Sequence, residues 1–344
     1  MSVPTNMEPG RPGSGLSSGG LDPSDGRDVD GTAAAGLSIK ARTQGELVLR
    51  RFVRHRGAMI GSFVFIAIIV LAVSSIGMGP IPGWWDKTFT TTGSVVDGGR
   101  PTLDPFPAFV DGDGFAVGES PFGQDSIGRD YFATTMRGAQ QSLQIALLVG
   151  LVSTIVGTVV GSIAGYFGGL TENVLMRVVD VMITIPLLLL AAVVARSTDG
   201  SAPTLGLLLG IVVWTSLARL VRGEVLSIKE REFVEAARAM GANPFRIITR
   251  HILPNIISTI IVSATLTIAA AILLETALSF LGFGVQAPDT SLGKLISEYQ
   301  TAFATRPWLF WFPGLMIIGI ALSVNFIGDG LRDAFDPRQN KVRA

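Results

Sequence analysis

Two carboxylates lie inside strongly apolar stretches of this sequence. Glu275 lies in the apolar segment 256–283, and Asp180 lies in a shorter one, one helical turn after Arg177. An ionisable group among apolar side chains is costly unless it is paired or hydrated. We therefore expect Glu275 to face protein or a water-filled path, where it either hydrogen-bonds a neighbouring helix or takes part in translocation or gating. For Asp180, the spacing favours an i,i+3 ion pair with Arg177 over a role in transport.

Other kinds of chemistry have little support. The chain has no cysteine and two histidines, which excludes disulfides, thiol nucleophiles and Cys/His zinc sites. Neither a paired nucleophile and base nor a metal-ligand cluster is present in the sequence. The phosphate-binding pattern Gly-x-x-x-x-Gly-Lys-Ser/Thr is also absent, and residues 292–295 lack its hydroxyl and its upstream glycine. We expect no catalytic residue, no cofactor, no metal, no nucleic-acid partner and no ATPase activity in this chain.

The elements that carry these residues are predicted to be membrane-spanning helices. Mean hydropathy is +0.49, and charged residues make up 16% of the 344 residues. About 20 apolar residues in a helix cross a hydrocarbon layer of about 30 Å. Six segments satisfy this length, with uncertain edges in the third and fourth: 59–78, 142–166, 174–195, 204–221, 256–283 and 308–331. The predicted fold class is all-α, a polytopic membrane protein with six transmembrane helices.

The distribution of Lys and Arg predicts the orientation of these helices. If the N-terminus is inside, the inner segments carry 18 of these residues, the outer segments carry 7, and two remain in the N-terminal tail. Positive residues favour the cytoplasmic side of a membrane. We therefore expect a multi-pass protein with both termini in the cytoplasm, surrounded by lipid.

Composition also divides the chain. Residues 1–40 are rich in Gly, Ser, Pro and Asp and are predicted to form a disordered cytoplasmic tail. A basic segment and the first transmembrane helix occupy 41–79. An extracytoplasmic cap occupies 80–141, where Trp84 and Trp85 are expected to anchor at the membrane interface rather than form a docking surface. The core of five helices spans 142–335, with a cytoplasmic loop at 222–255, and 336–344 form a C-terminal tail.

The cytoplasmic loop predicts two short helices joined at a bend. Phe233, Ala236, Ala237 and Met240 recur at i, i+3, i+4 and i+7, so they should line one side of the first helix. The pattern alone favours an amphipathic connector that lies on the membrane surface or covers part of this chain, and the alternative is a unit whose apolar side docks into a groove. Gly241 follows the last periodic residue and is predicted to end the helix with a positive φ.

The second short helix is predicted to begin immediately afterwards. Asn243 is a suitable N-cap and Pro244 a suitable first-turn residue. The helix is expected to stop near Pro254.

This loop resembles the EAA loop of ABC importer permeases through Glu235-Ala236-Ala237, Gly241 and Ile252-Leu253-Pro254. The resemblance implies a type I importer permease fold in which the loop is a coupling helix, seated in a cleft of a separate cytoplasmic ATPase. The coupling residues it implies are Glu235, Ala236, Ala237, Gly241, Asn243, Pro244, Phe245, Arg246, Ile252 and Pro254.

Four further blocks are similar to the peptide/nickel subfamily of these permeases and to its C-type member: 121–130, 165–180, 275–282 and 328–338. This likeness implies a bacterial inner (plasma) membrane, a sister permease subunit, two cytoplasmic ATP-binding subunits and an extracytoplasmic substrate-binding protein. It also implies a di- or oligopeptide substrate, with a nickel chelate or another small solute as the alternative. The rival from another class is a self-contained secondary transporter or channel that uses Glu275 and Asp180 as a proton relay.

Overall fold

The computed structural model describes residues 44–103 and 117–336, and these residues are helical apart from loops and two isolated bridges. The predicted fold class is therefore confirmed for this part of the chain. The predicted tail at 1–40 and residues 337–344 of the predicted C-terminal tail lie outside the described residues.

Four helices of the described part are long and apolar enough to cross a membrane without a break. They are α2 (Arg56–Ile76), α4 (Tyr131–Phe167), the continuous helix Pro244–Phe280, whose main part is α11 (Leu253–Phe280), and α13 (Trp308–Phe335). Because α4 already begins at Tyr131, the predicted cap at 80–141 includes its first turns. The first turns of this helix include Thr134, Thr135, Arg137, Gln140 and Gln141, and these polar residues keep the apolar stretch from extending to the start of the helix.

Two more spans are bent. α5 (Gly169–Thr184) and α6 (Leu187–Arg196) meet at 91°, and α7 (Ala202–Val213) and α8 (Thr215–Lys229) meet at 46°. The first break comes at Ile185, which is extended because the ring of Pro186 disfavours a helical residue before it. Counting each bent pair as one span gives up to the predicted six.

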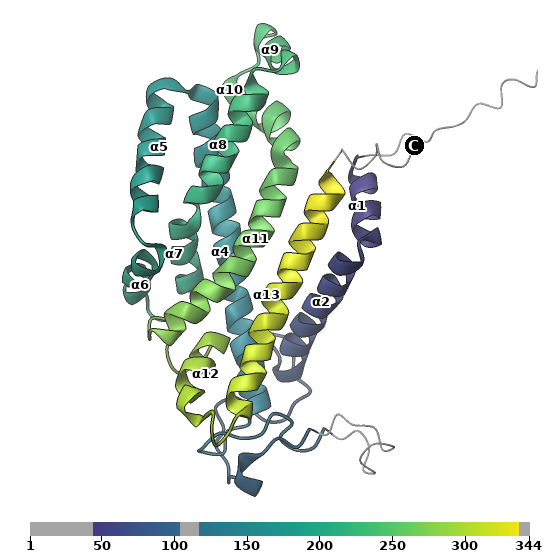
Figure 1. Ribbon diagram of the computed structural model, residues 1–344, viewed down its shortest axis with the longest axis vertical. Helices are drawn as coiled ribbons and strands as arrows, with labels where there is room; N and C mark the ends of the chain where they lie inside the picture. The colour runs from purple at the N-terminus through teal and green to yellow at the C-terminus, as the bar shows by residue number, and fades with distance from the viewer. Residues whose placement is uncertain (1–43, 104–116, 337–344) are drawn as a thin grey trace, which may run out of the picture. The chain divides into compact units, whose positions relative to one another are not determined.

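The long helix α4 is the centre of the packing. It contacts α7, α8 and α11, while α13 packs against α2 and α11, as Figure 1 shows. Glycines on α4 allow the close approach of α8: a Cβ on Gly161 would lie 2.5 Å from the carbonyl oxygen of Ala218, and one on Gly165 would lie 2.8 Å from Cβ of Val225. Small residues thus bring these two membrane helices together.

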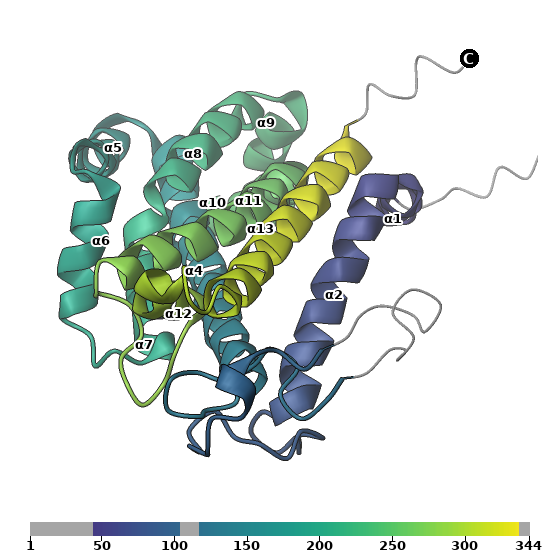
Figure 2. The same cartoon turned by 60° about the horizontal axis from the view of Figure 1, so that its bottom comes forward.

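The remaining elements lie at the two ends of the bundle. α9 (Glu232–Ala239) projects at one end, near α10 (Pro244–Arg246), and α1 (Gln44–Arg54) precedes α2 at the same end. The short helix α12 (Leu292–Tyr299) lies at the opposite end. The described parts of the segment before α4, with the single turn η1 (Asp97–Gly99), gather there too (Figure 2). The two ends differ in how their polar groups are used.

Candidate functional site

The first helix of the loop forms as its sequence predicts. Glu232 and Glu235 lie in the first turn of α9 and Arg238 in the last, the arrangement that the helix dipole favours. Gly241 then adopts φ +81°, and its N–H donates to the carbonyl of Arg238 while that of Ala242 donates to Ala237, both at 3.0–3.1 Å. These two bonds form a Schellman motif. The prediction of a positive φ at Gly241 is confirmed.

The second helix begins as predicted but does not stop near Pro254. Oδ1 of Asn243 accepts from the backbone N–H of Arg246 at 2.8 Å, and Pro244 occupies the first turn. From there the chain stays helical to Phe280, passing through a π-helical turn, η2 (Ile247–Ile252).

Proline is tolerated here because the π turn widens the helix before it. The N–H of Leu253 donates to the carbonyl of Ile248, five residues back, rather than four. A wider turn relieves the clash between a proline ring and the preceding turn. Nδ2 of Asn255 donates to the carbonyl of His251 at 2.6 Å. The predicted second short helix is therefore the start of the fifth span, so a movement of α9 reaches α11 directly.

The buried side of α9 differs from the predicted docking side. Val234 and Ala237 are buried, and Val234 packs in a cluster with residues of three other elements: Leu217, Val221 and Val225 of α8, Ile247 and Ile252 of η2, and Ile256 and Ile260 of α11. Ala237 therefore faces the chain itself, and its expected place on a docking surface is wrong. The i+4 spacing correctly predicted that Ala237 lies beside Phe233 on the apolar side of the helix. Periodicity does not show which residues of that side the chain itself covers.

Three large apolar side chains remain uncovered near α9. Phe233 is 44%, Phe245 is 75% and Met240 is 80% exposed, and Ala236 is exposed between them. We call Phe233, Ala236, Met240 and Phe245 the apolar flank. Apolar side chains grouped on a small protruding element are typical of a surface that binds another protein or a membrane. Helices that bind in a groove present anchors at this i, i+3, i+7 spacing.

Glu275 is completely buried and hydrogen-bonded. The hydroxyls of Ser279 and Ser142 donate to its two oxygens at 2.6 and 3.1 Å. Ser142 Oγ also accepts from the N–H of Leu292 at 3.1 Å, and Ser279 Oγ lies 3.2 Å from that of Ser291. The carboxylate thus joins α4, α11 and the N-terminus of α12. Of the two expected roles, the geometry favours the structural hydrogen bond.

Asp180 does not pair with Arg177. Its Oδ1 lies 2.8 Å from Nη2 of Arg219 on α8, and both side chains are about half exposed. One turn further along α8, Arg222 pairs with Glu172, also on α5. An Arg that precedes Asp by three residues is the weaker orientation of a helical pair, whereas the antiparallel helix offers a better partner. Asp180 and Glu275 share no hydrogen bond, so the proton relay has no support in the geometry.

A polar network at the α12 end was not predicted. Oδ2 of Asp125 accepts from Nε of Arg129 at 2.6 Å and from the hydroxyl of Tyr299 at 3.1 Å. Nη2 of Arg129 also donates to Tyr299. Burial, reinforced by the Asp125 carboxylate, raises the pKa of Tyr299. Asp125 and Arg129 belong to a motif that the sequence shows. Nothing in the sequence indicated that Tyr299, on α12, would bind them.

The tryptophans of this end also differ from the prediction. Nε1 of Trp85 donates to Oδ1 of Asp130 at 3.1 Å, and its ring packs edge to face against Phe132 with centroids 5.0 Å apart. Trp85 is therefore part of the fold rather than a membrane anchor. Trp84 is 56% exposed, so the anchoring role stays a prediction for that residue alone.

The fold and this loop define a polytopic helical membrane protein with a protruding helix at one end of its bundle. The family model described as "Binding-protein-dependent transport system inner membrane component" matches residues 157–341, and the model described as "N-terminal TM domain of oligopeptide transport permease C" matches residues 43–81. The chain therefore belongs to the family of binding-protein-dependent transport system inner membrane components, the permease subunits of ABC importers.

Two sequence relatives agree with this assignment, and one solved structure is similar in part. The oligopeptide transport system permease protein OppC of Mycobacterium tuberculosis (strain ATCC 25618 / H37Rv) is 40% identical over 300 residues, which cover 86% of this chain and 96% of the relative. OppC of Bacillus subtilis (strain 168) is 32% identical over 305 residues, 89% of this chain and 93% of the relative. An inward-facing structure of the MetNI methionine ABC transporter is 23% identical, with a TM-score of 0.47, over 59% of this chain and 97% of that one.

Proposed function

We propose that the chain is the transmembrane permease subunit of an ATP-driven importer for di- or oligopeptides. It would form the translocation path with a sister permease, receive substrate from an extracytoplasmic binding protein, and be driven by two cytoplasmic ATP-binding subunits. Family membership and the names of the relatives support the importer and its peptide substrate. The single observation that carries the coupling is the exposed apolar flank, which α9 and the start of α10 present.

In this proposal the apolar flank seats in a cleft of one ATP-binding subunit. The opposite side of α9 is anchored through Val234 to α8 and α11. A movement of the cleft would therefore carry α9 and the ends of both spans together as a rigid body, which is how packed elements pass on a conformational change. Hydrolysis takes place on the partner subunits, and this chain supplies no catalytic group.

Gly241 and Asn243 fix the angle between α9 and the fifth span, while Glu235 and Arg246 lie exposed beside the flank. We propose that these four residues orient the coupling helix. Three further residues support the flank from within the chain. Ala237 and Ile252 are buried against the bundle, and Pro254 follows the π-helical turn that continues into the fifth span.

The orientation is part of the proposal. The excess of Lys and Arg on one side supports cytoplasmic termini and a cytoplasmic α9 in a bacterial inner membrane. Ser94 and Asn243 are both exposed, and the chain has no cysteine of its own. In whole cells, a thiol introduced by S94C should react with a membrane-impermeant reagent applied outside, whereas one introduced by N243C should not. The reverse pattern would contradict this orientation.

The substrate is tested by reconstitution. The chain and its partner subunits are placed in proteoliposomes, and ATP-dependent uptake is measured for a set of di- to pentapeptides and for a nickel chelate. Peptide uptake is the expected result. Uptake of the nickel chelate alone would assign the alternative substrate, and uptake that proceeds without ATP or the ATP-binding subunits would contradict the importer.

A further inference from the structure

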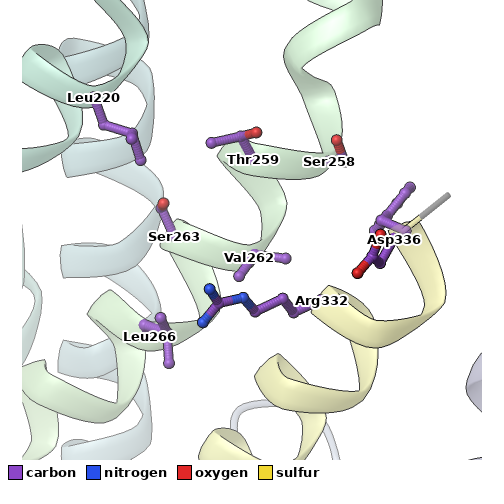
Figure 3. Close-up of a pocket in the computed structure, with 9 residues that line it drawn as sticks. Leu220, Ser258, Thr259, Val262, Ser263, Leu266, Arg332 and Asp336 are labelled. Carbon is purple, nitrogen blue, oxygen red and sulfur yellow. The ribbon is translucent and has the colours of Figure 1, made fainter. Parts of the chain in front are cut away.

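A cavity of about 470 Å³ lies between α8, α11 and α13 at the α9 end of the bundle. Its walls are partly apolar, with Leu220, Val262 and Leu266. They also carry the hydroxyls of Ser258, Thr259 and Ser263, and the side chain of Arg332 (Figure 3). The polar groups thus come from two helices and meet in one hollow.

The hydroxyls of α11 are used in two different ways. Thr265, Thr267 and Thr276 each donate to a backbone carbonyl of their own helix at 2.8–2.9 Å, which is the usual use of hydroxyls in a membrane helix. The three hydroxyls that line the cavity have no such bond within the described part of the chain. Their donors are free to serve a ligand.

Arg332 is the cation of this cavity. Within the described residues no carboxylate lies at ion-pair distance from its guanidinium. Asp336 also lines the cavity, but it has interactions of its own; Figure 3 shows it at the end of α13, away from the guanidinium. Free hydroxyls together with an unpaired guanidinium form a site for an anion, and carboxylates fit the guanidinium fork well.

The direction of Arg332 favours a water-filled path over a lipid headgroup. In Figure 3 its guanidinium extends across the cavity toward Ser263 and Leu266 rather than toward Ser258 at the end of the helix. The distance along α11 from Ser258 to Leu266 is about 12 Å. An arginine that faces lipid turns toward the headgroup layer instead.

The wall of the cavity also differs from the faces that suit hydrocarbon. The exposed side of α2 presents Ile60, Phe63, Ile66 and Val70, a continuous strip of large apolar side chains. The corresponding stretch of α11 in the cavity alternates hydroxyls with Val262 and Leu266. Such a wall suits a solute that has both apolar side chains and an anionic end.

We propose that this cavity binds the C-terminal carboxylate of the transported peptide before the peptide leaves toward the cytoplasm. The guanidinium of Arg332 and the hydroxyls of Ser258 and Ser263 donate to the carboxylate. Val262 and Leu266 contact the last side chain of the peptide. This inference rests on the proposed peptide substrate.

The test uses the whole complex, without nucleotide, in lipid nanodiscs. V262C introduces a thiol into the cavity wall without removing a donor. Its rate of modification by a small charged methanethiosulfonate reagent is measured with trialanine and with trialanine amide. I257C is the matched control, because Ile257 is 46% exposed on the same helix but lines a neighbouring cavity.

Trialanine should slow the modification of V262C and leave I257C unchanged, and the amide should protect neither. Adding R332Q should raise the peptide concentration for half-maximal protection by roughly tenfold or more, whereas R332K should retain part of the protection. Equal protection by the amide, or unchanged protection with R332Q, would overturn the inference. Protection that follows the phosphatidylglycerol content of the disc instead of the peptide would assign a lipid site and also overturn it.

The same complex separates this inference from the proposed function. ATP-driven uptake of trialanine in proteoliposomes, measured with the unmodified chain, tests whether the importer carries peptides. Normal uptake combined with protection that ignores Arg332 refutes the carboxylate site alone. Absence of uptake for every peptide refutes the proposed substrate, and the site falls with it.

Discussion

The two ends of the bundle use their polar and apolar groups in opposite ways. At the α12 end, buried polar groups are tied to each other: Glu275 to Ser142 and Ser279, and Asp125 to Arg129 and Tyr299. At the α9 end, large apolar side chains are exposed. Polar ties that are buried and satisfied give rigidity, whereas exposed apolar groups need a partner. The polar network of the α12 end is paired within the chain, whereas the described residues leave the apolar flank uncovered.

This difference predicts that mutations in the polar network of the α12 end act on folding and that those in the apolar flank act on assembly. The two effects are separable, because unfolding is measured on this chain alone and assembly on the complex. The predictions below test the difference, beginning with the largest effect on stability.

Replacing Glu275 is expected to have the largest effect. E275L leaves the buried hydroxyls of Ser142 and Ser279 without their acceptor, and each unsatisfied group costs about 1–3 kcal/mol. E275Q keeps an acceptor and should stay close to the unmodified chain in thermal unfolding in detergent and in uptake. If E275Q unfolds normally but abolishes uptake, the charge of Glu275 serves translocation and the structural interpretation is wrong.

The contact between α4 and α8 is expected to come next. G161L places a side chain where even a Cβ would be 2.5 Å from the carbonyl oxygen of Ala218, and overpacking costs about 1–3 kcal/mol. G223A is the control on α8, since no atom lies within 4 Å of a Cβ there. Its helix should gain roughly 0.5–1 kcal/mol. Equal thermal stability of the two variants would show that the two helices separate easily.

Gly241 is expected to affect coupling more than folding. G241V forces a β-branched residue into φ +81°, at a cost of about 1–3 kcal/mol, but no atom lies within 4 Å of a Cβ at this position. The strain should be released by a change in the angle between α9 and the fifth span. Membrane abundance should therefore persist while ATP-driven uptake falls. Normal uptake by G241V would show that the loop is only a connector.

Asp130 gives the smallest effect, a change in pH dependence. Burial raises the pKa of this carboxyl, while hydrogen bonds from the N–H of Ala133 and from Trp85 act in the opposite direction. A raised carboxyl pKa means that stability is fully present below the ordinary value of 3.8 and is lost as pH rises through the raised value. D130N keeps the N-cap and removes this loss. Its unfolding temperature should rise relative to the unmodified chain as pH increases above 3.8, and parallel curves would contradict the prediction.

Much of this architecture is readable from the sequence because apolar length and glycine chemistry are local signals. The spans, the end of α9 at Gly241 and the cap at Asn243 depend only on nearby residues. The partners of Asp180 and Tyr299 were not predictable, because they lie on other helices and require tertiary packing. Pro254 was misleading for a related reason: a proline usually ends a helix, and the widened turn that accommodates it leaves no clear mark in the sequence.

The burial of Ala237 was not predictable for the same reason. Periodicity identifies the residues on one side of a helix. It does not show which of them are buried within the chain and which are exposed for a partner. The exposed fractions of Phe233, Met240 and Phe245 supplied that distinction. They make the apolar flank the central claim about how this subunit works.

The most direct test of that claim is the amount of ATP-binding subunit that co-purifies with two single-charge variants. Met240 and Ala239 are adjacent and both exposed, so M240D and A239D place the same charge at the same end of α9, but only M240D lies in the apolar flank. M240D should lower both the recovered ATP-binding subunit and its substrate-stimulated hydrolysis by roughly tenfold, since a charge in an apolar groove costs about 1.4 kcal/mol or more. A239D should retain most of both. Equal losses in the two variants, or no loss in either, would contradict the docking of this flank.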